Sequence, residues 1–163
     1  MVTMNWGQFA KASPELAALG RERFEARELC MLGTLRAGGW PRISPCELDL
    51  VGDELLLGMM WQSPKARDLL RDNRCVLHSC TSNRDGTEGD FKLYGRARDE
   101  HDPQIHEAYR AAVRSRIDWE PTGQFHLFAI EVSSAGFVIF SPDSYAIAWD
   151  PELGTRRWNQ RLE

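Results

Sequence analysis

The sequence predicts a mainly β protein, an antiparallel barrel or closed sheet with a few helices attached. About seven or eight short apolar segments alternate with turn sequences, and most connections have hairpin length. Hairpins join antiparallel strands, whereas parallel strands need long crossovers. Only three segments have the period of an amphipathic helix. Because the sequence contains neither a GxGxxG nor a Walker pattern, a Rossmann or P-loop nucleotide site is not expected.

Composition and charge narrow the class of protein. The chain has 163 residues, of which 42% are hydrophobic and 27% are charged, as expected for a soluble domain that buries its own core. The net charge is −4 and no basic tract occurs, so nucleic acid is not an expected partner. The sequence shows no apolar run of membrane-spanning length and no leader at Met1, so we expect a cytoplasmic protein with no membrane partner. Cys75 and Cys80 fall on opposite faces of one predicted strand, and we interpret the cysteines as structural thiols.

The N-terminal region is expected to add one helix to a single domain that spans residues 1–163. Residues 1–12 show no clear period and predict a loose lead-in. Residues 13–28 begin with Ser13-Pro14-Glu15, which combines a capping residue, a proline suited to the first helical turn and an early acid. This region therefore predicts an N-terminal helix packed against the sheet.

The strand expected over residues 40–50 contains two prolines. The turn Ala37-Gly38-Gly39 joins it to a strand over residues 29–36 and supplies the positive φ angles of a tight hairpin. Because Pro41 and Pro45 cannot donate to a ladder, this strand should lie at a sheet edge or contain a bulge. The further expected elements are strands over residues 54–61, 74–81, 90–100, 124–132, 136–141, 145–149 and 155–162, with helices over residues 63–71 and 102–117.

The junction between the strand over residues 54–61 and the helix over residues 63–71 is the expected ligand site. Ser63 stands at the N-cap position, and Lys65 and Arg67 lie in the first turn. Free N–H groups and the positive end of the helix dipole attract anions, and the two cations add charge. The sequence therefore predicts a phosphate site here, with Lys65 as the principal ligand and Ser63 as a cap, a ligand or both.

The order of these motifs resembles the pyridoxamine 5′-phosphate oxidase-like, FMN-binding split-barrel superfamily. The resemblance covers roughly residues 28–158. It rests on GGWPRISP at residues 38–45, SPKARDL at residues 63–69, DNRCVL at residues 72–77 and LYGRA at residues 93–97. It implies an antiparallel split β-barrel of the FMN-binding type with appended helices.

The resemblance also implies a set of cofactor-binding residues. Members of the family grip the FMN phosphate with a serine–lysine segment, line the flavin with an arginine-bearing strand and run a second strand backbone beside the isoalloxazine ring. A C-terminal segment either closes the pocket from a second subunit or packs locally. The residues expected on this basis are Ser63 and Lys65, then Arg42, Ile43, Ser44 and Pro45, then Gly58 and Met59, and finally Trp149 and Arg157. No catalytic residue is identified, and no metal ligand is expected.

Three positions depart from the pattern of true pyridoxamine phosphate oxidases. Glu47, Pro64 and Asp90 stand where those oxidases carry a lysine, an arginine and a ring-contacting glutamine. The chain therefore resembles split-barrel relatives that use FMN or the deazaflavin coenzyme F-420.

The function implied by the resemblance is that of a flavin-binding oxidoreductase. In it FMN transfers a hydride or electrons to or from a small organic substrate. One alternative is an F-420-dependent reductase of the same fold, whose acidic tail needs further cations such as Arg36, Arg42 and Arg67. The other is a non-catalytic flavin-binding or haem-binding protein. A homodimer with cofactor sites at its interface is expected.

Overall fold

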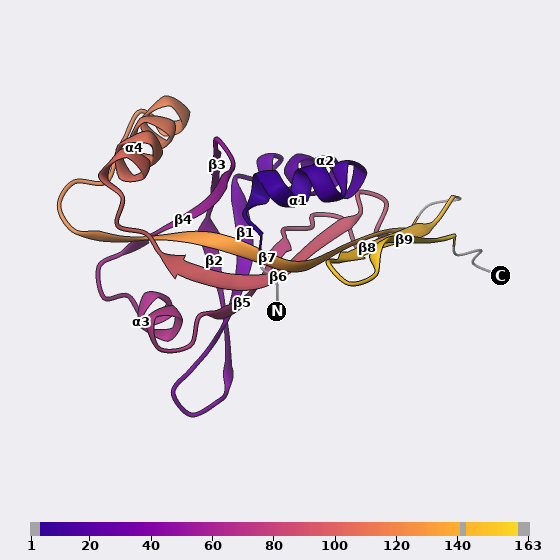
Figure 1. Ribbon diagram of the computed structural model, residues 1–163, viewed down its shortest axis with the longest axis horizontal. Coiled ribbons are helices and arrows are strands. Elements are labelled where there is room, and N and C mark those ends of the chain that lie inside the picture. Colours follow the sequence, from indigo (N-terminus) through magenta and orange to yellow (C-terminus); the bar gives the residue numbers. More distant parts are fainter. Residues whose placement is uncertain (1–3, 141–142, 160–163) are drawn as a thin grey trace.

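The computed structural model describes residues 4–140 and 143–159 as a curled sheet with helices on its surface (Figure 1). The helices are α1 (Trp6–Ala12), α2 (Pro14–Glu25), α3 (Pro64–Arg71) and α4 (Pro103–Ile117). The strands are β1 (Leu29–Leu35), β2 (Pro41–Glu47), β3 (Asp49–Val51), β4 (Glu54–Met60), β5 (Arg74–Ser79), β6 (Asp90–Asp99), β7 (Phe125–Ile139), β8 (Tyr145–Asp150) and β9 (Gly154–Asn159). The predicted mainly β class with appended helices is confirmed.

The sheet is antiparallel throughout and has an open seam. Its main path runs β2-β1-β5-β6-β7-β4-β3, while β8 pairs with β7 and β9 pairs with β8. Across the seam, β2 and β4 approach one another without pairing. Among the described residues β2 pairs with β1 alone. The edge position predicted from Pro41 and Pro45 is therefore confirmed.

Helix α1 corrects the prediction of a loose lead-in over residues 1–12. Residues 6–12 are helical because Asn5 and Gln8 form a capping box, in which each side chain bonds the other's backbone N–H. Trp6 and Phe9 then bury their rings in the core. Residues 1–3 lie outside the described residues.

Helix α2 lies against the same face of the sheet as α1 (Figure 1). It ends at Glu25, before the predicted boundary at residue 28. A Cβ atom at Gly20 would lie 2.6 Å from the ring of Phe91. The glycine therefore permits the close approach of helix and sheet, which offsets its weak helix propensity.

Strand β7 replaces two strands predicted over residues 124–132 and 136–141. It is continuous for 15 residues, and it carries one extra residue, Ser133, opposite the step from Tyr94 to Gly95. The bulge at Ser133 falls between the two predicted strands, and the pairing with β6 continues on both sides of it. Conversely, the strand predicted over residues 40–50 divides into β2 and β3. Of the last predicted strand, residues 160–162 lie outside the described residues, as does residue 141.

Two groups of buried side chains hold the fold together. The larger one fills the inside of the curled sheet below α1 and α2. The smaller one joins α4 to β4 and β7 through Leu56, Tyr109, Val113, Leu127 and Ala129. No helix in the described ranges is both long and apolar enough to cross a membrane.

Candidate functional site

The N-terminus of α3 begins at a tight corner after β4. Gln62 adopts a left-handed conformation with φ +56°, which turns the chain directly from the strand into the helix. Ser63 occupies the N-cap position, yet its side chain makes no capping hydrogen bond. Its Oγ atom is buried and has no hydrogen-bond partner within the described part of the chain. A buried hydroxyl without a partner is unfavourable, so Ser63 keeps a donor and an acceptor that a ligand at this helix end could satisfy.

Lys65 ties the first turn of α3 to the edge strand β2. Its Nζ donates to the backbone oxygen of Pro45 at 2.9 Å. The proline therefore contributes a carbonyl at a position where an edge strand has no neighbouring strand to bond. Because an ammonium group has three protons, Lys65 retains two donors for a ligand.

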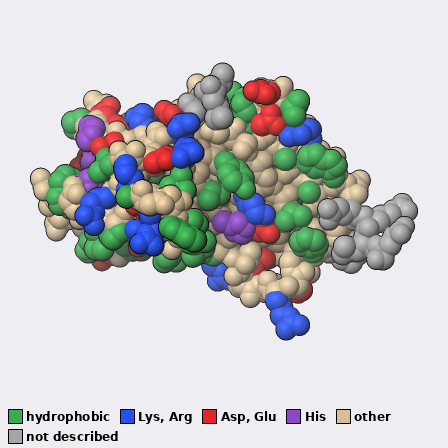
Figure 2. Space-filling view, turned by 90° about the horizontal axis from the view of Figure 1, so that it is seen from below, with side chains coloured by type: hydrophobic (Ala, Val, Ile, Leu, Met, Phe, Trp, Pro, Cys, Tyr) green, Lys and Arg blue, Asp and Glu red, His purple; other side chains and the backbone are tan. Residues whose placement is uncertain are grey.

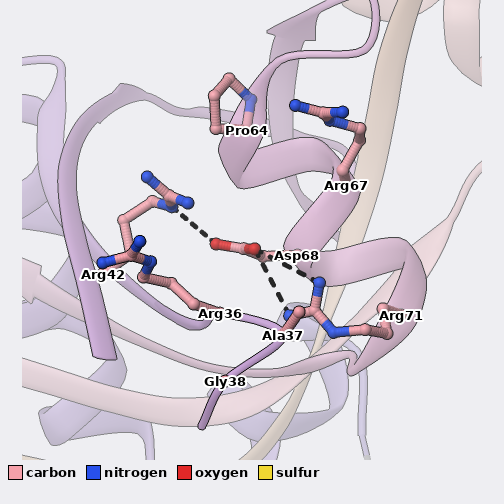
Figure 3. Close-up of a pocket in the computed structure, with 8 residues that line it drawn as sticks. All are labelled: Arg36, Ala37, Gly38, Arg42, Pro64, Arg67, Asp68 and Arg71. Atoms are coloured by element: carbon pink, nitrogen blue, oxygen red, sulfur yellow. Dashed lines mark hydrogen bonds and ion pairs between the residues drawn. The ribbon is translucent and has the colours of Figure 1, made fainter. Parts of the chain in front are cut away.

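A cavity of about 370 Å³ lies beside this helix, between α3 and the hairpin that joins β1 to β2 (Figure 3). We call it the arginine pocket, and its lining residues are Arg36, Ala37, Gly38, Arg42, Pro64, Arg67, Asp68 and Arg71. Four arginines and one aspartate give the pocket a formal charge of +3. Such a surface attracts anions.

Asp68 lies between two of these arginines (Figure 3). Its Oδ2 accepts from Arg42 Nε at 2.6 Å and from Thr34 Oγ1 at 2.9 Å, and its Oδ1 faces Arg71 at 3.4 Å. Burial by itself raises the pKa of Asp68, but the hydrogen bonds from Arg42 and Thr34 and the charge of Arg42 outweigh it. The net effect lowers the pKa of Asp68 below its ordinary value, so this carboxylate stays ionised at neutral pH.

The other two arginines of the pocket are not neutralised. Arg36 and Arg67 form no ion pair with any described residue, and both are exposed. In Figure 3, Arg67 points away from Asp68. Their charges are thus available to a ligand.

The structure brings several predicted site residues together. Arg42 lines the arginine pocket with the first turn of α3, and Ser63, Lys65 and Pro45 meet where α3 approaches β2. On the same strand, Ser44 is half-buried, whereas Ile43 points outward and is 70% exposed.

Gly58 and Met59 lie on β4, across the seam from β2. The Met59 side chain is buried in the core, so only its backbone is available to a cofactor ring. A Cβ at Gly58 would lie 2.0 Å from the hydroxyl of Tyr109, so the glycine is needed for packing against α4. Their role beside a flavin stays a prediction.

Trp149 and Arg157 lie away from α3, at the opposite end of the sheet (Figure 1). Trp149 packs locally within this chain, because its ring is 3% exposed and lies against Phe9 with centroids 5.1 Å apart. A role for Trp149 at the cofactor pocket of a second subunit stays a prediction. Arg157 pairs with Glu15 at 2.7 Å and lies over the Tyr145 ring. Any contact of Arg157 with the α3 site requires a second copy of the chain and stays a prediction.

Sequence reasoning missed Asp68, Thr34 and Arg71 as members of the site. The spacing of Asp68 and Arg71, three residues apart on one predicted helix, places them on one face. It does not reveal that Arg71 also reaches the backbone oxygen of Leu35 on β1. That contact depends on how α3 packs, which the local pattern does not encode.

Comparisons with known proteins agree with this fold. The sequence model of the pyridoxamine 5′-phosphate oxidase family matches residues 17–139. No curated protein sequence matches the chain. Several solved structures resemble it at low sequence identity, which supports the fold alone.

Three of these structures show the range of the fold. An FMN-binding protein related to pyridoxamine 5′-phosphate oxidase, from Nostoc punctiforme, has a TM-score of 0.62 and 13% identity, covering 91% of this chain and 96% of that one. PhzG from Burkholderia lata, solved with tetrahydrophenazine-1-carboxylic acid, has a TM-score of 0.62 and 11% identity, covering 96% and 93%. A haem-binding protein from Mycobacterium smegmatis has a TM-score of 0.60 and 17% identity, covering 87% of this chain but 57% of that one.

The family match spans well over half of the chain, and the fold, the edge strand and the basic helix N-terminus occur in the order that the sequence motifs predicted. The chain belongs to the pyridoxamine 5′-phosphate oxidase-like, FMN-binding split-barrel superfamily.

Proposed function

We propose that the chain binds FMN and acts as a flavin-dependent oxidoreductase on a small organic substrate. The observation that carries this proposal is the unpartnered, buried Ser63 Oγ at the N-terminus of α3, beside Lys65. A phosphate placed there would meet a hydroxyl, free backbone N–H groups and a cation together. FMN ends in such a phosphate, and its ring would supply the hydride or electron transfer.

The protein's own part is to bind and orient the cofactor. Lys65 and Ser63 would hold the phosphate, and Arg42 would add a second cation from the edge strand. The seam between β2 and β4 leaves the backbone of β2 unpaired on its outer side. This seam is where we expect the flavin ring to lie.

A second candidate cofactor is coenzyme F-420, and the arginine pocket favours it. Its acidic tail continues beyond the phosphate, and Arg36, Arg42 and Arg67 all line one cavity next to α3. FMN has no group that needs these charges beyond its phosphate. Haem-binding relatives, including the protein from Mycobacterium smegmatis and HutZ from Vibrio cholerae, make a non-catalytic carrier the third candidate.

We also propose that the chain forms a homodimer through the face of the sheet opposite α1 and α2 (Figure 2). The strand register places Ile43, Gly33, Val76 and Tyr94 in one row across β2, β1, β5 and β6. Ile43 and Tyr94 are 70% and 51% exposed. An apolar row of this kind is expected to be covered by a partner, and a second copy would bring its own residues toward the seam.

The first experiment is the visible spectrum of the purified protein after addition of FMN or F-420 and removal of unbound cofactor. Retained flavin bands support the FMN proposal, and retention of F-420 alone supports the deazaflavin candidate. A Soret band indicates haem. Retention of none of the three contradicts the proposal.

Lys65→Ala tests the phosphate site directly. It should weaken FMN binding much more than riboflavin binding, because riboflavin lacks the phosphate. Arg21→Ala is a matched control, since Arg21 is an exposed helix cation paired with Glu25 and lies on α2, outside the α3 site. Equal weakening of FMN and riboflavin by Lys65→Ala would contradict the assigned role.

A further inference from the structure

The arginine pocket contains one acid, and its presence needs a reason. A carboxylate next to an anion site repels the ligand, so the site would bind more tightly without it if charge alone mattered. Yet Asp68 is 4% exposed and remains ionised, and three side chains from three elements converge on it. The function of Asp68 must therefore lie in the side chains that it binds.

Asp68 holds Arg42 in a particular way. The hydrogen bond joins Oδ2 of Asp68 to Nε of Arg42, the nitrogen nearest the side-chain stem. Neither terminal nitrogen of Arg42 bonds to any described residue, so both Nη groups stay free. An arginine fixed by Nε keeps its terminal fork available for a bidentate contact with an anion.

Arg71 is held differently. Both of its terminal nitrogens face Oδ1 of Asp68, at 3.4 and 3.5 Å, and Nη2 also donates to the backbone oxygen of Leu35. Its donors are thus directed into the protein. Arg71 connects α3 to β1, whereas Arg42 is oriented toward the pocket.

Thr34 completes the arrangement by fixing Asp68 itself. It is buried on the inner face of β1 and donates to the oxygen that holds Arg42. A free arginine side chain loses considerable rotamer entropy when it is immobilised. Because Arg42 is already immobilised in the folded protein, ligand binding does not incur this entropy loss again.

We propose that Asp68 is a positioning residue, an internal counter-ion that fixes Arg42 through Nε so that its terminal nitrogens grip the anionic group of the ligand. The inference rests on the proposed function in one respect, namely that this anionic group is the cofactor phosphate. The ligand class is a phosphate monoester or a longer anion that begins with one.

The test compares FMN and riboflavin binding by wild type and Asp68→Asn. We expect Asp68→Asn to weaken FMN binding by about tenfold, as for the loss of one charged hydrogen bond, and to change riboflavin binding by less than about twofold. Removal of a merely repelling charge would instead strengthen FMN binding. The sign of the change therefore decides between positioning and repulsion.

A double-mutant cycle with Arg42 separates positioning from a general structural role. In an Arg42→Ala background, Asp68→Asn should cause no further loss of FMN affinity, because Asp68 acts through Arg42. The same tenfold loss in both backgrounds would overturn the proposal. Asp72→Asn is the matched control: Asp72 is the next acid along the chain, pairs with Arg74 and does not line the pocket, so FMN binding should be unchanged.

Two further measurements keep the test decisive. If Asp68→Asn does not fold, Arg42→Lys serves in its place. Lysine keeps the charge but has no Nε anchor, so this variant should lose most of the preference for FMN over riboflavin.

Inorganic pyrophosphate is a probe independent of the flavin, and its binding is measured by calorimetry. If FMN fails to bind but pyrophosphate shows the predicted dependence on Asp68, the proposed function fails and this inference stands. If wild type binds neither, the inference is overturned.

Discussion

The two ends of the molecule use their side chains in opposite ways. At the end covered by α1 and α2, aromatic rings pack against one another. Trp6 contacts Phe9 edge-on with ring centroids 5.4 Å apart, and Phe24 contacts Phe91 with centroids 5.3 Å apart. At the α3 end, Ser63 Oγ is unpartnered and Arg36 and Arg67 lack acids, within the described residues. The first end is organised for stability, whereas the second keeps binding capacity that the folded chain itself does not use.

Trp149→Ala tests whether the aromatic end serves stability, and it should have the largest effect on the free energy of unfolding. We expect it to reduce the free energy of unfolding by about 3–5 kcal/mol, because removing the large ring packed on Phe9 leaves a cavity that the surrounding core cannot fill. Urea unfolding measures the change, and Trp158→Ala is the control, since Trp158 is exposed on β9. A small loss of stability together with a large loss of cofactor affinity would place Trp149 at the site after all.

Gly58→Ala tests whether packing constraints extend to the α3 end. We expect a destabilisation of about 1–3 kcal/mol, because the new Cβ would overlap the hydroxyl of Tyr109. The loss should be smaller in a Tyr109→Phe background, which removes the closest atom. Gly136→Ala on β7 is a suitable control, because its nearest neighbour would lie 3.6 Å away. If both glycine variants were equally stable, the close contact at Gly58 would be wrong.

Glu88 gives the α2-covered end a dependence on pH. Hydrogen bonds from the backbone N–H groups of Asn83 and Ser82 lower the pKa of Glu88 to about 2. Because the folded pKa lies below the ordinary value of 4.5, the stabilisation is present above pH 4.5 and is lost as the pH falls toward about 2. Glu88→Gln should therefore be less stable at pH 7 and show a shallower decline in that window.

Acid titration of the free energy of unfolding, followed by circular dichroism, measures this effect. Glu22→Gln is the control, since Glu22 is an exposed residue of α2 whose side chain bonds to no described residue. Parallel pH curves for wild type and Glu88→Gln would contradict the assignment.

Arg157→Ala should have the smallest effect on stability. Its ion pair with Glu15 joins two exposed side chains, so we expect a loss of less than about 1 kcal/mol that diminishes as salt is added. Arg156→Ala, which breaks a comparable exposed pair with Asp150, is the matched control. If Arg157→Ala nevertheless weakened FMN binding, a second copy of the chain would have to supply this arginine to the α3 site.

Sequence patterns predicted the features that depend on local chemistry. The prolines of β2 identified the edge strand, and the serine–lysine spacing identified the start of α3, because both effects act within a few residues. The capping box of Asn5 and Gln8 was also present as a local signal and would have identified α1.

Features that depend on distant packing were not predicted. Asp68 meets Thr34 and Arg42 only because α3 folds back onto β1 and β2. Trp149 reaches Phe9 only because β8 extends the sheet beneath α1. In both cases the residue type allowed several environments, and the tertiary arrangement selected one.

The length of β7 has a consequence for how the molecule opens. This single strand forms a ladder with β4 near the α3 end and with β8 at the other end, and it pairs with β6 along the way. Local unfolding of one end would therefore disturb a backbone that the other end also uses. We expect the amide protons in both halves of β7 to exchange with solvent at similar, slow rates, as one cooperative unit.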